Sequence, residues 1–137
     1  MVLTRQFRLP VYINGHSGYL IEAAAGLLDN ASPEARILAE AEEETGFRVT
    51  HAEKVLEAYM SPGSVTEKLY FFIAEYHDDD RRGKGGGLAE EGEDIEVLEW
   101  PFARALAAIR SGEIEDAKTI ILLQHLALSA VFEGDSQ

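Results

Sequence analysis

The chain has 137 residues, a length that suits one globular domain over residues 1–137. Its 25 acidic and 12 basic residues leave a formal net charge of -13, which argues against general nucleic-acid binding because such a surface repels phosphates. The sequence contains no cysteine, which excludes disulfides, thiolate zinc sites and thiol nucleophiles.

The first third of the chain predicts short strands followed by a helix. Apolar runs between turn residues predict strands at residues 2–7, 11–13 and 19–22. Ser32 followed by Pro33 is typical of a helix start, and Gly46 is typical of a helix end. We therefore expect a helix from about Pro33 to Thr45.

The remaining chain continues to alternate strands with helices. Strands are predicted at residues 47–59, 69–76 and 95–100, and residues 77–91 predict a mobile surface loop. Pro101 begins a predicted helix that ends near Gly112. A last helix over residues 118–131 is apolar almost all round, so we expect it to be largely buried. We expect its His125 to be a core or interface histidine and not a catalyst. The fold class expected is α+β, with a mixed sheet packed between helices.

The sequence gives no support for several common functional sites, for a signal peptide or for a membrane span. The glycine-rich residues 83–87 lack the spacing of a phosphate-binding P-loop, the four histidines have no ligand spacing, and no Gly-x-Ser-x-Gly motif occurs. Arg5 and Arg8 interrupt the only apolar run near Met1, and no segment has the length of a membrane span. We expect a cytoplasmic protein with no membrane partner.

The end of the predicted 33–45 helix is unusually acidic. Steps of three and four residues place Glu40, Glu43 and Glu44 on one helix face, while Glu42 points elsewhere. No Lys or Arg follows to neutralise them, and each exposed acid at a helix C-terminus costs about 0.3 to 1 kcal/mol against the helix dipole. A solvated acidic face is one interpretation. The other is a cation site, since carboxylate oxygens are preferred ligands of Mg²⁺ and Mn²⁺.

A second acidic cluster lies at residues 90–94. In an extended backbone, Glu91 and Glu93 point the same way. The two acidic clusters, which come from distant segments, could therefore close around a metal ion.

Residues 26–47 resemble the Nudix box, whose general form is Gly-x5-Glu-x7-Arg-Glu-U-x-Glu-Glu-x-Gly-U with U aliphatic. The resemblance is greatest to the nucleotide-sugar branch of that superfamily. It extends over nearly the whole chain through the segments Arg5–Arg8, Tyr59–Gly63, Phe71–Tyr76, Gly85–Gly87, Asp94–Glu99 and Gly112–Ile114. This resemblance implies a Nudix-type α-β-α sandwich.

The resemblance also implies a role for particular residues. The side chains of Glu40, Glu44 and Glu93, with the main-chain carbonyl of Ala25, would bind Mg²⁺, or else Mn²⁺. Glu91 would activate the attacking water.

Three further residues receive supporting roles from the same resemblance. Glu43 would support the metal ligands. Arg8 would contact the nucleotide or its phosphates, as would Glu22.

The chain departs from the Nudix pattern at three points. Ser32 stands where the box has its first Glu, and Ala39 replaces the Arg that orients a box carboxylate. The relatives also carry an N-terminal extension with a core strand and dimer contacts, and this chain begins after it. We nevertheless expect a homodimer, as in the relatives.

The implied activity is Mg²⁺-dependent hydrolysis of a nucleoside diphosphate linked to another moiety. GDP-mannose is the preferred substrate, with GMP and mannose 1-phosphate as products. ADP-ribose is the alternative substrate. A non-catalytic nucleotide-sugar-binding module of Nudix fold is the alternative that involves no enzyme activity.

Overall fold

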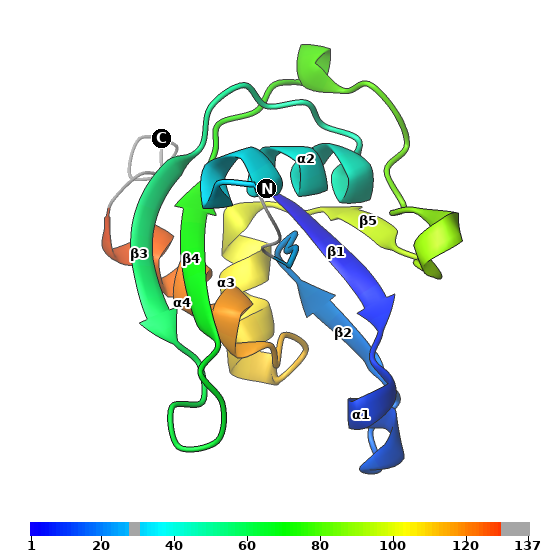
Figure 1. Cartoon of the computed structure of the whole chain (residues 1–137), viewed down its shortest axis with the longest axis vertical. Coiled ribbons are helices and arrows are strands. Elements are labelled where there is room, and N and C mark those ends of the chain that lie inside the picture. The colour runs from blue at the N-terminus through cyan, green and yellow to red at the C-terminus, as the bar shows by residue number, and fades with distance from the viewer. Residues whose placement is uncertain (28–30, 130–137) are drawn as a thin grey trace.

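A computed structural model describes residues 1–27 and 31–129, and it contains two antiparallel sheets (Figure 1). Strands β1 (Val2–Phe7), β2 (Tyr19–Glu22) and β5 (Glu96–Glu99) form the first sheet in the order β2-β1-β5. Strands β3 (Glu53–Tyr59) and β4 (Lys68–Ile73) form the second. The α+β class is thereby confirmed.

The strand pairing differs from the single mixed sheet that we expected. Every strand pair within the described residues is antiparallel. β1 and β2, like β3 and β4, are consecutive strands, and the chain between them is too short for the crossover of a dozen or more residues that parallel pairing requires.

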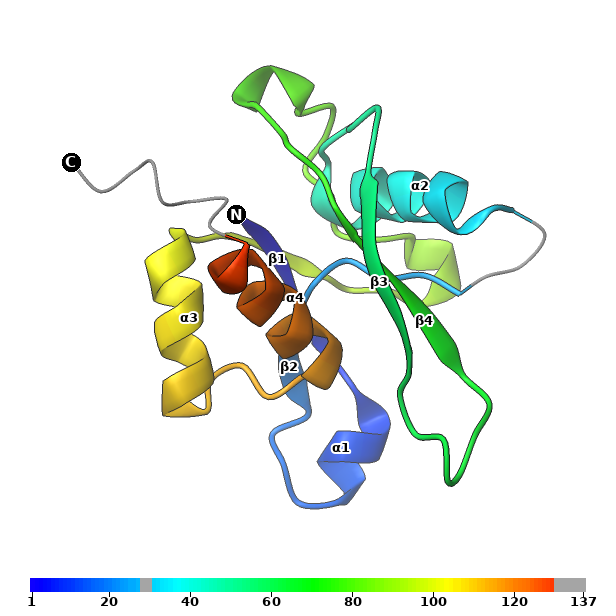
Figure 2. The same ribbon diagram turned by 90° about the vertical axis from the view of Figure 1, so that its left-hand side faces the viewer.

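Helices cover both sides of the first sheet. Figure 2 shows α3 (Phe102–Ser111) and α4 (Ala117–Leu128) on one side, with α2 (Pro33–Thr45) on the other. The main core lies between the sheet and the α3–α4 pair, and its buried residues are Leu3, Ile21, Ala105, Ala108, Ile114 and Leu123. Side chains alternate along a strand, so Leu3 enters this core while its buried neighbour Thr4 lies on the opposite face.

Helix α2 has the predicted bounds. The Ser32 hydroxyl accepts a hydrogen bond from the Ala35 amide at 3.2 Å, and Pro33 occupies the first turn. The helix ends at Gly46, whose φ of 80° is the left-handed conformation that glycine adopts readily.

Two strand predictions, for residues 11–13 and 47–59, were wrong in detail. Residues 11–13 belong to the short helix α1 (Leu9–Ile13) and not to a strand, because Pro10 suits a first helical turn. The Nδ2 group of the Asn14 side chain closes the end of this helix by donating to the Pro10 carbonyl at 2.8 Å. Residues 47–52 precede strand β3, and Phe47 makes only an isolated bridge, to Arg81.

The segment after β4 differs from the expected strand and loop. Strand β4 ends at Ile73, earlier than the predicted residue 76. The following segment contains two short 3-10 helices, η1 (Asp78–Asp80) and η2 (Ala89–Glu91). It is tied to the end of α2, because the amides of Gly86 and Gly87 donate to main-chain carbonyls there at 2.8 and 3.0 Å. Its mobility stays a prediction.

Helix α4 is less buried than its apolar sequence predicts. Only Thr119 and Leu123 are buried within the described helix, and Leu128 is 89% exposed. The helix packs on α3 and β2. His125 is partly buried, and residues 130–131 of the predicted helix lie outside the described residues. Within residues 1–27 and 31–129, no helix combines the length and apolarity that crossing a membrane requires.

Candidate active site

Helix α2 directs two carboxylates into the protein. Glu40 is 4% exposed and Glu44 is 2% exposed, whereas Glu43 is half-buried. The Ala25 amide donates to Glu44 Oε2 at 3.3 Å, which brings the segment after β2 beside the helix. The predicted acidic face is therefore confirmed. Glu42 points elsewhere, as expected, and pairs with Arg48 at 2.8 Å.

The buried carboxylates repel one another and other acids nearby. The pKa of Glu44 is raised to about 8, chiefly by burial and then by the charges of Glu40 and Glu93. Burial also raises the pKa of Glu40, with smaller contributions from Glu43, Glu93 and Glu91, although Arg36 acts in the opposite direction. The structure thus places the two predicted acidic clusters within electrostatic reach of each other.

The segment before β5 holds Glu93 in place. Its Oε2 accepts a hydrogen bond from the Leu88 amide at 2.8 Å. Gly87 adopts a φ of 78°, and a Cβ at this position would overlap the Glu93 side chain. Glu91 is exposed at the end of η2, where Gly92 follows with a φ of 76°. The glycine run therefore leaves room for Glu93 to turn back toward α2.

The expectation that no cation neutralises the acidic helix was wrong. Arg36 forms an ion pair with Glu40 from one helical turn earlier, and Arg48 pairs with Glu42 through two hydrogen bonds of 2.8 Å. The pairing of Arg36 with Glu40 could have been predicted from the sequence, because residues four apart lie on one helix face. Arg36 lies upstream of the acids, whereas our prediction considered only downstream cations and overlooked Arg48 among them.

The donor set fits a hard divalent cation. The side-chain groups are all carboxylates, which Mg²⁺ and Mn²⁺ prefer, and an ion of charge +2 would offset the burial and the repulsion that raise the pKa of Glu44. Within residues 1–27 and 31–129, no three acidic or histidine side chains lie close enough together to hold an ion. The chemistry and charge of these carboxylates therefore suit a metal ion, although the side chains are too far apart in this structure to hold one.

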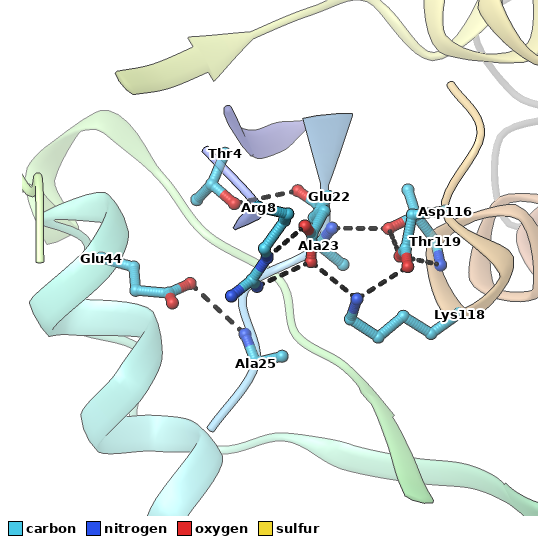
Figure 3. A network of polar contacts seen from close by, with 9 residues as sticks. All are labelled: Thr4, Arg8, Glu22, Ala23, Ala25, Glu44, Asp116, Lys118 and Thr119. Atoms are coloured by element: carbon cyan, nitrogen blue, oxygen red, sulfur yellow. Dashed lines mark hydrogen bonds and ion pairs between the residues drawn. The ribbon is translucent and has the colours of Figure 1, made fainter. Parts of the chain in front are cut away.

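A buried network of charges adjoins the acidic cluster (Figure 3). Glu22, which is 1% exposed, accepts hydrogen bonds from Arg8 Nε and Nη2 at 2.8 and 3.0 Å. Lys118 Nζ donates to the same carboxylate at 2.7 Å. Burial alone raises the pKa of Glu22, but the bonds from Arg8 and Lys118 outweigh it and hold the pKa below its ordinary value.

Helix α4 supplies the far side of this network. Asp116 caps the helix by accepting from the Thr119 amide at 3.0 Å, and it also accepts from Lys118 at 2.8 Å. The Thr119 hydroxyl in turn accepts a hydrogen bond from the Ala23 amide at 2.7 Å. Our sequence analysis missed Lys118 and Asp116. The Asp-x-x-Thr cap predicts the start of α4, but nothing local predicts its contact with β2.

The predicted site residues therefore fall into two adjoining groups. Arg8 links them. Its guanidinium pairs with Glu22, and the charge of Glu44 also contributes to raising the pKa of Arg8. Figure 3 shows both side chains at the segment after β2, where Glu44 contacts Ala25 and Arg8 contacts Glu22. Ala25 lies between the groups, and its amide, rather than its carbonyl, makes the described contact with Glu44.

No family model matches the chain. Among curated proteins, the chain is similar to the GDP-mannose pyrophosphatase of Pectobacterium atrosepticum, with 56% identity over 133 residues that cover 96% of this chain and 68% of that protein. The proteins of the same name from Salmonella typhimurium and Cronobacter sakazakii are 55% and 56% identical, and both alignments cover 97% of this chain and 69% of the relative.

This identity over more than two thirds of each relative decides the family. The chain belongs to the GDP-mannose pyrophosphatases. Members of this family are Nudix hydrolases, so the resemblance of residues 26–47 to the Nudix box is confirmed at the level of the family. The GDP-mannose pyrophosphatases are also the enzyme class that the resemblance to the Nudix box implies.

Proposed function

We propose that the chain hydrolyses GDP-mannose to GMP and mannose 1-phosphate with the help of Mg²⁺. The names of the relatives support this substrate. The observation that carries the proposal is that the buried Glu40 and Glu44 of α2 lie beside the segment that holds Glu93. The amides of Gly86 and Gly87 in that segment donate to the carbonyls of Glu44 and Glu43.

Glu40, Glu44 and Glu93 would hold the metal, together with the Ala25 carbonyl and with Glu43 as support. When bound, Mg²⁺ neutralises charge on the diphosphate oxygens and makes a water molecule more acidic. Burial of Glu40 and Glu44 suits this role, because buried carboxylates without a cation are costly.

Glu91 is the proposed general base. It is exposed and sits on the same segment as Glu93, so it can reach a water molecule at the edge of the acidic cluster. Glu91 accepts the proton as the water oxygen attacks one phosphorus. The P–O bond to the bridging oxygen then breaks, and the leaving phosphate keeps that oxygen.

Arg8 is the proposed phosphate contact. Its side chain is 41% exposed, although Glu22 holds it by two hydrogen bonds. This pairing fixes the direction of the guanidinium, and the N–H groups that Glu22 does not use can bind a substrate oxygen. Glu22 would thus act on the substrate through Arg8.

We also propose a cytoplasmic homodimer. A sequence without cysteine suits a reducing compartment. The surface offers a set of exposed apolar side chains around α1, here called the α1 patch, which comprises Phe7, Leu9, Tyr12, Ile13 and Tyr19. Contiguous exposed apolar side chains of this kind mark protein interfaces.

The test of the function is release of GMP from GDP-mannose in the presence of Mg²⁺. Glu40→Gln and Glu44→Gln should each lower kcat at least about 100-fold, because each removes a charged metal ligand. Glu42→Gln is the matched control, since Glu42 lies on the same helix but pairs with Arg48 away from the cluster. Undiminished turnover in both variants would contradict the metal assignment.

The same assay separates the alternatives. GDP-mannose and ADP-ribose in competition identify the preferred substrate through the ratio of their kcat/KM values. Tight binding of GDP-mannose without any product after long incubation with Mg²⁺ would indicate a binding module instead of an enzyme.

A further inference from the structure

Glu40 has a partner that the Nudix pattern does not supply. The box places an arginine directly before this glutamate, and Ala39 stands there in this chain. Arg36, one turn earlier on α2, instead brings its Nη2 to Glu40 Oε1 as an ion pair. The side chain of Glu40 is 5% exposed and that of Arg36 is 26% exposed, so the contact is largely sheltered from solvent.

The Arg36 contact differs in geometry from two other arginine–glutamate pairs. Arg8 and Arg48 each use Nε and Nη2 to bind both oxygens of one carboxylate. The Nε of Arg36 is buried, and it has no hydrogen-bond partner among the described residues. Arg36 therefore does not cover the Glu40 carboxylate side-on, which would occupy both of its oxygens.

Gly26 confines the same carboxylate from another direction. A Cβ at Gly26 would overlap the Oε1, Cγ and Cδ atoms of Glu40, so the main chain at residue 26 packs directly on that side chain. Glu40 is thus held between a backbone segment and a guanidinium. A carboxylate fixed in this way, with one oxygen not covered by the arginine, suits a metal ligand.

We propose that Arg36 is a positioning residue that orients Glu40 toward the divalent cation and takes over the role of the arginine missing at position 39. This inference rests on the proposed function. A purely structural ion pair would stabilise the helix without affecting cation binding. A positioning residue affects both, because loss of an outer-shell partner weakens metal binding.

The test measures Mn²⁺ affinity by electron paramagnetic resonance of the free ion, without substrate. Arg36→Met should bind Mn²⁺ about 10- to 100-fold more weakly than the natural chain. Arg36→Lys should lose less, because it retains the charge. The double variant Arg36→Met/Ala39→Arg should recover part of the loss, because it returns an arginine to the position that the box uses.

Arg48→Met is the matched control. It removes an arginine–glutamate ion pair that also involves α2, but it leaves Glu40 untouched, so its Mn²⁺ affinity should equal that of the natural chain. Circular dichroism confirms that each variant is folded. Should Arg36→Met prove unstable, Arg36→Lys and the double variant carry the test.

The outcomes separate this inference from the proposed function. Equal or tighter Mn²⁺ binding by folded Arg36→Met overturns the positioning role, and tighter binding would identify Arg36 as a competitor of the metal. Normal Mn²⁺ binding by the natural chain without GMP release overturns the function alone. Failure of the natural chain to bind Mn²⁺ overturns both.

Discussion

Glu22 shows how one buried charge depends on its neighbours. It is 1% exposed, and two cations from separate segments of the chain, Arg8 and Lys118, donate to it. A carboxylate this deeply buried is tolerated only while such partners are present.

Glu22→Gln should therefore destabilise the protein. The change leaves Arg8 and Lys118 beside a neutral amide, and breaking a buried ion pair costs about 3 kcal/mol, at the low end of the usual range because Arg8 is partly solvated. Urea unfolding at neutral pH measures the loss. Glu113→Gln, which breaks an exposed pair with Arg104, should change little and serves as the control.

The stability that Glu22 contributes should depend on pH. Its pKa in the folded protein lies below the ordinary value of 4.5, so the folded state binds the proton less readily than the unfolded state. The contribution is present above pH 4.5 and is lost as the pH falls through the lowered value. The free energies of unfolding of the natural chain and Glu22→Gln should hence converge in acid. A gap that stays constant down to the acid transition would refute the assignment.

The contacts of some single residues could be predicted from the sequence, and those of others could not. The acidic face of α2 follows from the spacing of Glu40, Glu43 and Glu44 alone. Lys118 could not be linked to Glu22, because 96 residues separate them and only tertiary packing brings them together.

At the scale of elements, the site depends on the end of α2 meeting the segment before β5. The Gly86 amide donates to the Glu44 carbonyl at 2.8 Å, and the amide of Ile95 donates to the Gly86 carbonyl at 3.1 Å. Residue 86 therefore bridges the two segments that carry the acidic clusters.

Gly87→Ala tests whether the contact between the end of α2 and the segment before β5 positions Glu93. The added Cβ would overlap Glu93, so we expect at least about 10-fold weaker Mn²⁺ binding, in line with the loss of a ligand's support. Gly92→Ala is the matched control. It imposes a similar strain at a φ of 76°, but its Cβ meets nothing within 4 Å. Equal losses in the two variants would attribute the effect to backbone strain alone.

The elements were predictable where their signals are local. Ser32, Pro33 and Gly46 define both ends of α2, and the structure has the same bounds. The helix α1 was not predicted, because a short apolar run beside a proline suits a strand as well as a first helical turn. The antiparallel pairing of β1 with β5 joins distant segments, and no local pattern specifies it.

At the scale of the whole molecule, the exposed α1 patch predicts self-association. Ile13→Glu should convert the proposed dimer to a monomer, because Ile13 is 70% exposed in the isolated chain and a charge there would be buried between copies. Light scattering after size exclusion measures the mass. Leu128→Glu places the same charge on a more exposed apolar residue outside the patch and should leave the mass unchanged. A natural chain that elutes as a monomer would contradict the proposal.

The bond between Ala23 and Thr119 has a consequence for how the chain is made. The ribosome synthesises β2 long before α4, so Glu22 leaves the exit tunnel before Lys118, which pairs with it in the folded protein, has been made. Until Lys118 has also left the ribosome, Glu22 lacks one of its two cation partners, so we expect β2 to stay hydrated and loosely packed. Completion of the fold is therefore a late event, tied to the arrival of the last helix.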